Sequence, residues 1–461
     1  MRGIKRDRAL IVIVVSLSII ISSFIYIYSL RDKNVFELKD IKGDRDTLSD
    51  LVITGYLQDR YHGNEFKISN GKITHQFKYY DNTNFIKPYL QAVDSNNYGK
   101  YNYSRNYSYK VARDANIRIE HTDEDVMDTL NDGSVIKGRK KTITTYADKI
   151  DVYMTLHRYD WDFLSKRRGR YSDPNFLMFK TGVYIESEKM DFSFNRDKTD
   201  YGEGGGHFSS DVFSGEALEN ASATNGFTEL AGRQYITEVT FVEDSQHHKK
   251  CTGEAGIYMV EEYGHWLGED EVGKVRKIVS VDLDGGKTQI LGLHGIENKL
   301  VLLMIVDDVL TFRAYDPDSG DLMGELPVPK FEVQGNMCAY DAYLDGNRLT
   351  LDFSDKYMYS ENVYKVKNSL KVLSIEVDED IKLLHCIDNF DLENRAIEGI
   401  SNIVSVDGRL TILVRLQDIA ARRSMIAGSI DGFLYNHFLY PIEFTIFIFD
   451  DAEEGNLIYE G

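Results

Sequence analysis

The sequence is poor in cysteine, proline and tryptophan, with 3, 6 and 2 of these residues among 461. Three cysteines, an odd number, give no disulfide framework, so a small disulfide-stapled scaffold is excluded. The few prolines, beside 36 glycines and 42% hydrophobic residues, exclude collagen and disorder and indicate a large core. The chain is longer than one compact core usually holds, so it contains several domains or one large modular fold.

Positive charge is also scarce. The 54 basic side chains are outnumbered by 74 acidic ones, which leaves a formal net charge of -20. This sign is wrong for binding a phosphate backbone, so no nucleic-acid partner is expected. A surplus of carboxylates also serves solubility alone.

One long hydrophobic run is present, and it lies at the N-terminus. Residues Ala9–Leu30 carry no charge and follow the basic residues Arg2, Lys5, Arg6 and Arg8. As a helix this run reaches about 33 Å, which predicts a single transmembrane helix and a membrane partner. The basic flank predicts a cytoplasmic N-terminus and an extracytoplasmic bulk of the chain, at the cell membrane. A cleaved signal peptide is the alternative.

Three segments follow from this interpretation. Residues 1–30 form a cytoplasmic basic stub and transmembrane signal anchor, residues 31–50 a juxtamembrane linker, and residues 51–461 an external domain. From about Leu51 the chain consists of short runs of β-branched and aromatic residues, separated by Gly, Asn and Asp turns, which predicts an all-β domain. The run Leu300–Ile305 is apolar throughout and predicts a strand covered on both faces. Asp307-Asp308 after it predicts a tight turn.

The spacing of the predicted turns favours a β-propeller. We expect seven such turns, at 69–72, 147–149, 180–182, 253–256, 297–299, 344–347 and 406–409. Between Glu254, Glu297, Asp345 and Asp407 the intervals are 43, 48 and 62 residues. A four-stranded blade takes about 40 to 50 residues, so the fold class predicted is an N-terminal transmembrane helix followed by a β-propeller of about seven (six to eight) blades.

Two segments resemble known propeller families. Ile278–Lys287, followed by Ile290 and Leu291, resembles the outer hairpin of Tol-type blades. Tyr315–Leu322 is similar to the Asp-x-x-Ser/Thr-Gly turn of quinoprotein-like blades, although Gly324 and Glu325 stand where that family has a docking Trp. The resemblance covers about Ile278 to Pro329. It implies a fold and no activity, because propellers host enzymes, receptors and scaffolds.

Helical patterns are scarce. Thr122 as N-cap and the acidic residues after it predict a short helix over Asp123–Leu130, and Gln417–Ala427 predicts a second. The segment Asp197–Gly226 holds six glycines with little apolar periodicity, which indicates a long loop.

No catalytic, cofactor or metal motif is found. Gly202–Gly206 lacks the Lys-Ser/Thr ending of a phosphate loop, and His247, His248 and Cys251 lack a fourth zinc ligand. Asp282 and Asp316 begin Asp-rich segments without the Glu of a calcium loop, so they are interpreted as turns. We expect no cofactor, and a triad or carboxylate pair assembled from distant residues stays open.

An alternating tyrosine strip is the candidate binding site. Tyr101, Tyr103, Arg105, Tyr107 and Tyr109 are separated by Asn and Ser, so in a strand all five project from one face. Tyr and Arg surfaces suit sugar rings or protein partners. The alternative is that the rings pack in the core.

The function that this sequence favours is a non-enzymatic binding, scaffold or sensor protein with a protein partner. One alternative is a cell-surface polysaccharide-binding protein that uses the tyrosine strip. The other is an envelope hydrolase or quinone-dependent enzyme. Buried titratable groups that converge would favour an enzyme, and an exposed aromatic patch would favour a binding protein.

Overall fold

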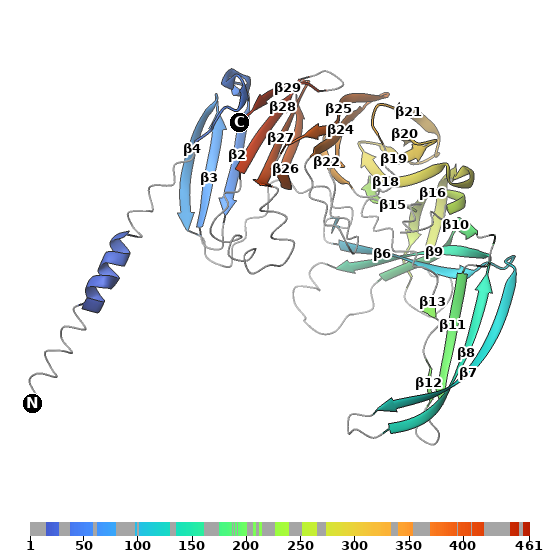
Figure 1. Ribbon diagram of the computed structural model, residues 1–461. Coiled ribbons are helices and arrows are strands. Elements are labelled where there is room, and N and C mark those ends of the chain that lie inside the picture. The colour runs from blue at the N-terminus through green and yellow to red at the C-terminus, as the bar shows by residue number, and fades with distance from the viewer. Residues whose placement is uncertain are drawn as a thin grey trace, which may run out of the picture. The chain divides into compact units, whose positions relative to one another are not determined.

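The protein is described by a computed structural model (Figure 1). The structure describes residues 15–26, 37–58, 62–79, 97–98, 101–129, 135–160, 175–186, 188, 190, 192–200, 206–208, 212–213, 226–238, 251–264, 273–332, 340–353, 369–393, 395–406, 408–418, 443–450 and 455–461. Almost all of these residues lie in antiparallel β-strands and their turns. The predicted all-β class is confirmed.

The structure does not support the predicted transmembrane helix. The described part of the apolar N-terminal run is helical over residues 15–26. Among the residues that are described, no helix combines the length and the apolar character needed to cross a membrane.

The chain divides into two compact units. Unit 1 takes residues 1–88 together with 445–448 and 457–461, and unit 2 takes the residues between them, 89–444 and 449–456. Unit 1 contains β1 (Lys42–Gly43), the 3-10 helix η1 (Arg45–Leu48), β2 (Val52–Gln58), β3 (His62–Ser69), β4 (Lys72–Tyr79) and β29 (Leu457–Glu460). β2, β3 and β4 form a three-stranded antiparallel sheet.

Two segments far apart in the sequence pair in unit 1. β1 pairs with β29, so that Lys42 lies opposite Glu460 and Gly43 opposite Tyr459. On the other side, Gly461, the residue after β29, forms two backbone hydrogen bonds with Ile446. Ile446 belongs to β28 (Glu443–Phe449). The last described residues are thus held by backbone bonds on both sides.

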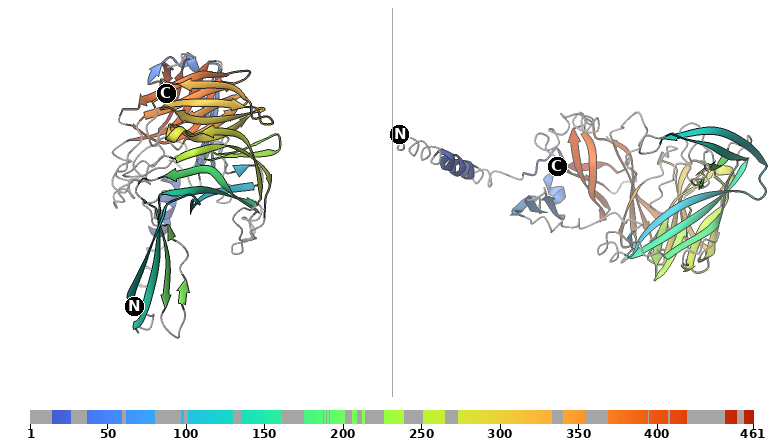
Figure 2. Two further views of the ribbon diagram at one scale, coloured as in Figure 1. Left: turned by 90° about the vertical axis from the view of Figure 1, so that its right-hand side faces the viewer. Right: turned by 90° about the horizontal axis from the view of Figure 1, so that it is seen from below.

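Unit 2 contains two larger sheets at its N-terminal end. The first has the order β14 (Phe227–Leu230), β15 (Arg233–Thr237), β16 (Cys251–Glu262), β10 (Asn175–Glu186), β9 (Lys149–Asp160), β6 (Tyr101–Val111) and β5 (Asn97–Tyr98), with β17 (Lys274–Asp282) also paired to β16. The second has the order β12 (Gly206–Phe208), β11 (Phe192–Asp200), β8 (Val135–Ala147) and β7 (Ile117–Thr129), with β13 (Val212–Phe213) paired to β11. Figures 1 and 2 show the long strands β7, β8 and β11 side by side.

Two four-stranded meanders follow. One is formed by β18 (Thr288–Ile296), β19 (Lys299–Val306), β20 (Val309–Tyr315) and β21 (Leu322–Val328), and the other by β22 (Asp341–Asp345), β23 (Arg348–Asp352), β24 (Ser369–Val377) and β25 (Ile381–Asp391). The pair β26 (Arg395–Val406) and β27 (Arg409–Asp418) comes next. A short 3-10 turn, η2 (Asp284–Gly286), precedes β18.

β19 confirms the predicted strand with two covered faces. Val301, Leu303 and Ile305 belong to a core shared with the β22–β25 meander. Leu300, Leu302 and Met304 belong to a second core shared with strands of the β16 sheet. Because successive residues of a strand point to opposite faces, the uninterrupted apolar run fills both cores at once.

Several predicted turns are confirmed by their backbone angles. Asn70 and Gly71 have φ values of 53° and 65°, and Asp307 and Asp308 have φ values of 48° and 65°. Two positive φ values in a two-residue loop match the right-handed twist of a hairpin. Asp316 Oδ1 accepts hydrogen bonds of 2.9 and 2.8 Å from the amides of Asp318 and Ser319, as expected for an Asp turn.

Other predicted turns are wrong. Residues 180–182 lie inside β10, and residues 253–256 lie inside β16. Asp148 does not close a hairpin, because β8 pairs with β7 and β11 whereas β9 pairs with β6 and β10. The segment Ile278–Lys287 forms no hairpin either, since β17 pairs with β16 and β18 pairs with β19. In each case the small or polar residues mark a bulge or a change of sheet.

The helix predicted over Asp123–Leu130 is wrong, because residues 123–129 belong to β7 and Leu130 lies outside the described residues. The acidic residues of this segment lie opposite basic residues of β8. Asp123 faces Lys141, and Asp125 faces Arg139. Opposite charges on neighbouring strands stabilise the pairing. Of the second predicted helix, Gln417 and Asp418 end β27, and residues 419–427 lie outside the described residues.

The long loop predicted over Asp197–Gly226 is wrong for most of the residues of this segment that the structure describes. Its first residues continue β11 to Asp200, and β12 and β13 pair with β11 further along. The remaining residues of this segment lie outside the described part of the chain, apart from Gly226.

Candidate functional site

Glu238 is buried directly after β15, and its side chain accepts a hydrogen bond from the backbone of β16. β15 pairs with β16 as far as Thr237, opposite Ile257. At the next position Gly256 N donates a 3.0 Å hydrogen bond to Glu238 Oε2, and Thr237 Oγ1 donates one of 2.7 Å to Gly256 O. Both backbone groups of Gly256 are therefore satisfied by side chains, which hold the carboxyl group against β16.

The local backbone explains why residue 256 is a glycine. A Cβ atom there would lie 1.9 Å from Val279 O on β17. The pairing of β16 with β17 shifts its register beside Tyr258, and the pairing of β10 with β9 shifts between Lys180 and Tyr184. Such bulges redirect side chains and are common next to active sites.

Burial controls the ionisation of Glu238. Its side chain has 2% of its surface exposed, and this desolvation raises the pKa of Glu238 to about 7. The nearby Tyr258 hydroxyl, the amide of Gly256 and the charge of Lys277 favour the carboxylate and offset part of the increase. Oε1 has no hydrogen-bond partner among the described residues.

Further polar groups come from β16 and β17. Lys277 Nζ lies 5.7 Å from the centroid of the Tyr258 ring and 3.6 Å from Glu254 Oε2. Ser280 Oγ donates a 2.9 Å hydrogen bond to the same oxygen of Glu254. Burial raises the pKa of Tyr258, so its hydroxyl stays neutral and able to donate a hydrogen bond at neutral pH.

This arrangement supplies a proton-transfer group at neutral pH. A carboxyl group with a pKa near 7 is populated in both its forms, so it can accept a proton in one step and return it in the next. A strongly shifted pKa with a physical cause is also what marks acid–base residues in enzymes. Glu238 is therefore the strongest candidate for a chemical role among the described residues.

The predicted tyrosine strip lies on β6, as the alternation required. Tyr107 and Tyr109 are half-buried and pack against a hydrophobic core, and burial raises the pKa of Tyr109. The side chains of Tyr101, Tyr103 and Arg105 lie outside the described residues. The strip stays a prediction as a binding site, and its two described rings face the core.

The other candidate sites from the sequence are metal sites, including the group His247, His248 and Cys251, and the glycine-rich phosphate loop. Cys251 is buried, which raises the pKa of its thiol to about 12, whereas His247 and His248 lie outside the described residues. Within the described ranges, no cluster of three His, Cys, Asp or Glu side chains is placed to hold a metal ion. Gly206, the last glycine of the phosphate-loop candidate, begins β12.

Glu238 is not among the candidate site residues predicted from the sequence. It stands in the run Tyr235-Ile236-Thr237-Glu238-Val239-Thr240, where a charged residue interrupts β-branched and aromatic neighbours. A carboxyl group inside such a run is a signal for a buried acid, because charged residues are seldom buried without a partner. Its contact with Gly256 was not predictable, since residues 239–250 separate the two strands without a turn signal that fixes their register.

Comparison with known proteins gives weak matches to peptidases. No protein-family model and no curated protein matches the chain. One similar solved structure comes from a study of two prolyl endopeptidases, with 10% identity, a TM-score of 0.20 and coverage of 81% of this chain and 54% of that one. Prolyl oligopeptidase B from Galerina marginata has 9% identity, a TM-score of 0.19 and coverages of 80% and 55%. The acylaminoacyl peptidase of Pyrococcus horikoshii has 8% identity, a TM-score of 0.16 and coverages of 81% and 59%.

These findings correct the main functional prediction. The chain spans little more than half the length of the structures that it matches. All three are peptidases, so the expectation of a non-enzymatic binding, scaffold or sensor protein is wrong against these comparisons.

Proposed function

We propose that this chain is a hydrolase in which Glu238 transfers the proton. The observation that carries the proposal is the buried Glu238 carboxyl group, which Gly256 N holds at one oxygen while the other oxygen has no hydrogen-bond partner among the described residues. Because burial raises its pKa to about 7, this group exchanges a proton readily at neutral pH.

The two carboxyl oxygens of Glu238 have different roles in the proposed proton transfer. Oε2 is fixed by the amide of Gly256, so the proton moves at Oε1. Because Glu238 is buried, the step requires the strands around it to open and admit water and substrate. In the carboxylate form Glu238 then takes a proton from the attacking water as the bond to the substrate forms. The same proton then passes to the leaving group as the bond to that group breaks, which returns the carboxylate and balances the reaction. Burial keeps the Tyr258 hydroxyl neutral, so it is able to donate a hydrogen bond.

The proposal includes a β-propeller as the scaffold. Its support is the succession of four-stranded meanders in unit 2, β18–β21 and β22–β25, each antiparallel and connected strand to strand. A meander of this kind is the building block of a propeller blade. The Asp316–Gly320 turn between β20 and β21 also has the hydrogen bonds expected from the quinoprotein-like resemblance.

Hydrolysis by matched glutamate variants tests the proposal. Wild type, Glu238→Gln and Glu229→Gln are incubated with chromogenic ester, peptide and glycoside substrates. Glu229 lies on β14 of the same sheet but is exposed, so it controls for the loss of one carboxylate. We expect turnover of one substrate class by wild type and Glu229→Gln, and a loss of roughly 100-fold or more in Glu238→Gln.

Circular dichroism and the melting temperature of Glu238→Gln separate chemistry from misfolding. A folded Glu238→Gln variant with the wild-type rate would overturn the assignment of Glu238. A folded wild-type chain that turns over none of the three classes would overturn the hydrolase. The pH profile adds a second criterion: in wild type the rate should change near pH 7, and this change should be absent in Glu238→Gln.

A further inference from the structure

One face of the β7–β8 sheet carries a row of exposed apolar side chains. Ile117, Ile119 and Met127 lie on β7, and Val135 and Ile143 lie on β8, with exposed fractions between 37% and 74%. All five have odd numbers, and the register pairs odd residues of β7 with odd residues of β8. Since side chains alternate between the faces of a strand, all five share one face. We call it the odd face.

The odd face also carries charge in two separate columns. The acidic column is on β7, at Asp123 and Asp125, and the basic column is on β8, at Lys137, Arg139 and Lys141. The columns are level with each other, because Asp123 lies opposite Lys141 and Asp125 opposite Arg139. Within the sheet Asp123 and Arg139 approach to 3.8 Å, and both stay exposed.

We propose that the odd face binds the odd face of a second copy of this chain. A two-fold axis that runs between β7 and β8, parallel to the strands, places β7 of one copy over β8 of the other at the same level. Each acidic residue then faces the basic column of the second copy, and each basic residue faces an acidic column. The face is complementary to itself in charge, and the exposed apolar side chains lie beyond both ends of the charged columns, at the same levels in the two copies.

The exposure pattern of β8 agrees with an interface on this side, whereas β7 is exposed on both faces. On β8 the odd residues from 135 to 143 are exposed, whereas the described even residues from 138 to 146 are half-buried. The even face has contacts of its own, such as the Arg118 guanidinium 4.5 Å from the centroid of the Tyr146 ring. Among the described segments, none covers the odd face. Exposed apolar rows bordered by charge are typical of interaction surfaces.

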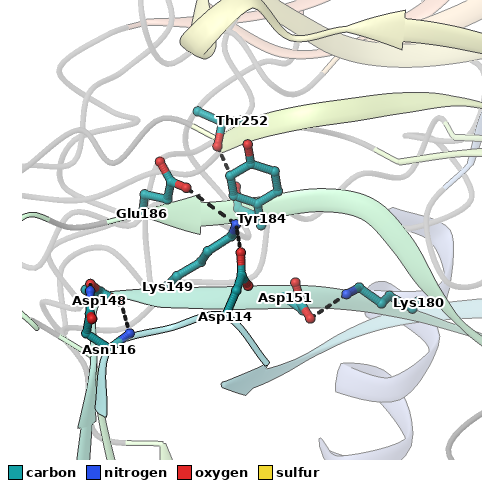
Figure 3. A network of polar contacts seen from close by, with 9 residues as sticks. All are labelled: Asp114, Asn116, Asp148, Lys149, Asp151, Lys180, Tyr184, Glu186 and Thr252. Atoms are coloured by element: carbon teal, nitrogen blue, oxygen red, sulfur yellow. Dashed lines mark hydrogen bonds and ion pairs between the residues drawn. The ribbon is translucent and has the colours of Figure 1, made fainter. Parts of the chain in front are cut away.

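A polar network fixes the base of the two strands (Figure 3). Asn116, just before β7, donates to both carboxylate oxygens of Asp148, the single residue between β8 and β9. Lys149 Nζ lies 2.7 Å from Asp114 Oδ2, 3.6 Å from Glu186 Oε1 and 4.2 Å from the centroid of the Tyr184 ring. Figure 3 shows Asp114, Glu186 and Tyr184 gathered around Lys149. This network presents the odd face in one orientation, which lowers the entropy cost of association.

Two complementary charge variants test the proposal in the full chain. Asp123→Lys/Asp125→Lys makes both columns basic, and Arg139→Glu/Lys141→Glu makes the two positions opposite the aspartates acidic. Sedimentation velocity is measured over a concentration series in a mild non-ionic detergent, which keeps the apolar residues 9–30 from associating. We expect wild type to dimerise, and each variant alone to dimerise roughly tenfold or more weakly. An equimolar mixture of the two variants should form a mixed dimer, because its columns are complementary again.

Glu124→Lys is the matched control, because Glu124 lies between the two aspartates on the opposite face. This variant should dimerise as wild type does. A monomeric wild type would overturn the proposal, and so would charge variants that dimerise normally or that fail to pair in the mixture although folded by circular dichroism. Association that is unchanged in every variant would assign the contact to another part of the chain, and would equally overturn the proposal.

Discussion

Two buried titratable side chains in unit 2 have pKa values displaced in opposite directions. Burial raises the pKa of Glu238 to about 7 and lowers the pKa of His294 to about 4. The His294 ring shares a 2.8 Å hydrogen bond with Tyr340 Oη in the core between the two meanders. Both side chains are therefore neutral in the folded protein over much of the weakly acidic range, as desolvation requires.

The signs of the two effects on stability are opposite. Glu238 has a folded pKa above its ordinary value of 4.5, so its contribution is complete below pH 4.5 and is lost as the pH rises through about 7. His294 has a folded pKa below its ordinary value of 6.5, so its contribution is present above pH 6.5 and is lost as the pH falls through about 4. A comparison of variants is needed to separate them.

We predict that Glu238→Gln gains stability relative to wild type as the pH rises. The amide cannot ionise, so the cost of burying a carboxylate disappears. The difference in the free energy of unfolding should grow by roughly 3 kcal/mol between about pH 4.5 and pH 7. Urea unfolding at several pH values measures it, and His294 cancels in the difference. The Glu229→Gln curve should run parallel to wild type, and a flat difference curve for Glu238→Gln would contradict the burial account.

At the scale of elements, β29 holds unit 1 together at its edge. Tyr459 is fully buried, and its hydroxyl donates a 2.8 Å hydrogen bond to Asp40 Oδ1. The carboxylate of Asp40 also forms a 2.7 Å ion pair with Arg45, which begins η1. Side chain and backbone of one short strand thus connect β1, η1 and β28.

Removal of residues 457–461 should therefore destabilise the protein strongly. The loss of one buried aromatic side chain alone costs about 3 to 5 kcal/mol, and unpaired backbone groups on β1 add to it. The variant Tyr459→Phe keeps the strand and loses only the hydroxyl, so it should cost about 1 kcal/mol. Denaturant unfolding measures both variants. Equal stability of the truncated chain and wild type would show that β29 contributes nothing to the fold.

The elements also show what the sequence could predict. β19 was predictable because its apolar run fills two cores, and the Asp307-Asp308 turn because two positive φ values suit these residues. β7 was not, because the acidic residues 123–125 alone suit a helix N-terminus as well as a strand. Only the pairing with residues 139–141 makes them a strand, and that pairing is a tertiary fact. Glu238 was missed for the same reason: the burial that raises its pKa results from tertiary packing.

At the scale of the molecule, the contacts differ widely in sequence separation. Most strands pair with a neighbour in the chain, such as β19 with β20 across a two-residue turn. The contact between Asp40 and Tyr459 instead joins residues 419 positions apart. Because the entropy of closing a loop grows with its length, contacts of this separation are the slowest to form.

We therefore predict that unit 1 completes its edge after the meanders of unit 2 have formed. Pulse-labelling hydrogen exchange during refolding should show early protection of amides in β19 and β20. The amides of Ile41, Ile446 and Gly461, which bond across the closure, should be protected later. Simultaneous protection of both groups would contradict this order and indicate a single cooperative step.

The pairing of β1 with β29 also sets a time interval during synthesis. At about 5 to 20 residues per second, the ribosome makes Tyr459 roughly 20 to 80 s after Asp40. Throughout that interval β1 has no strand to pair with, whereas β2, β3 and β4 already have each other. A chain whose synthesis stops before residue 457 keeps the edge of β1 unpaired permanently. The unpaired edge of β1 thus distinguishes an unfinished molecule from a finished one for proteases and chaperones.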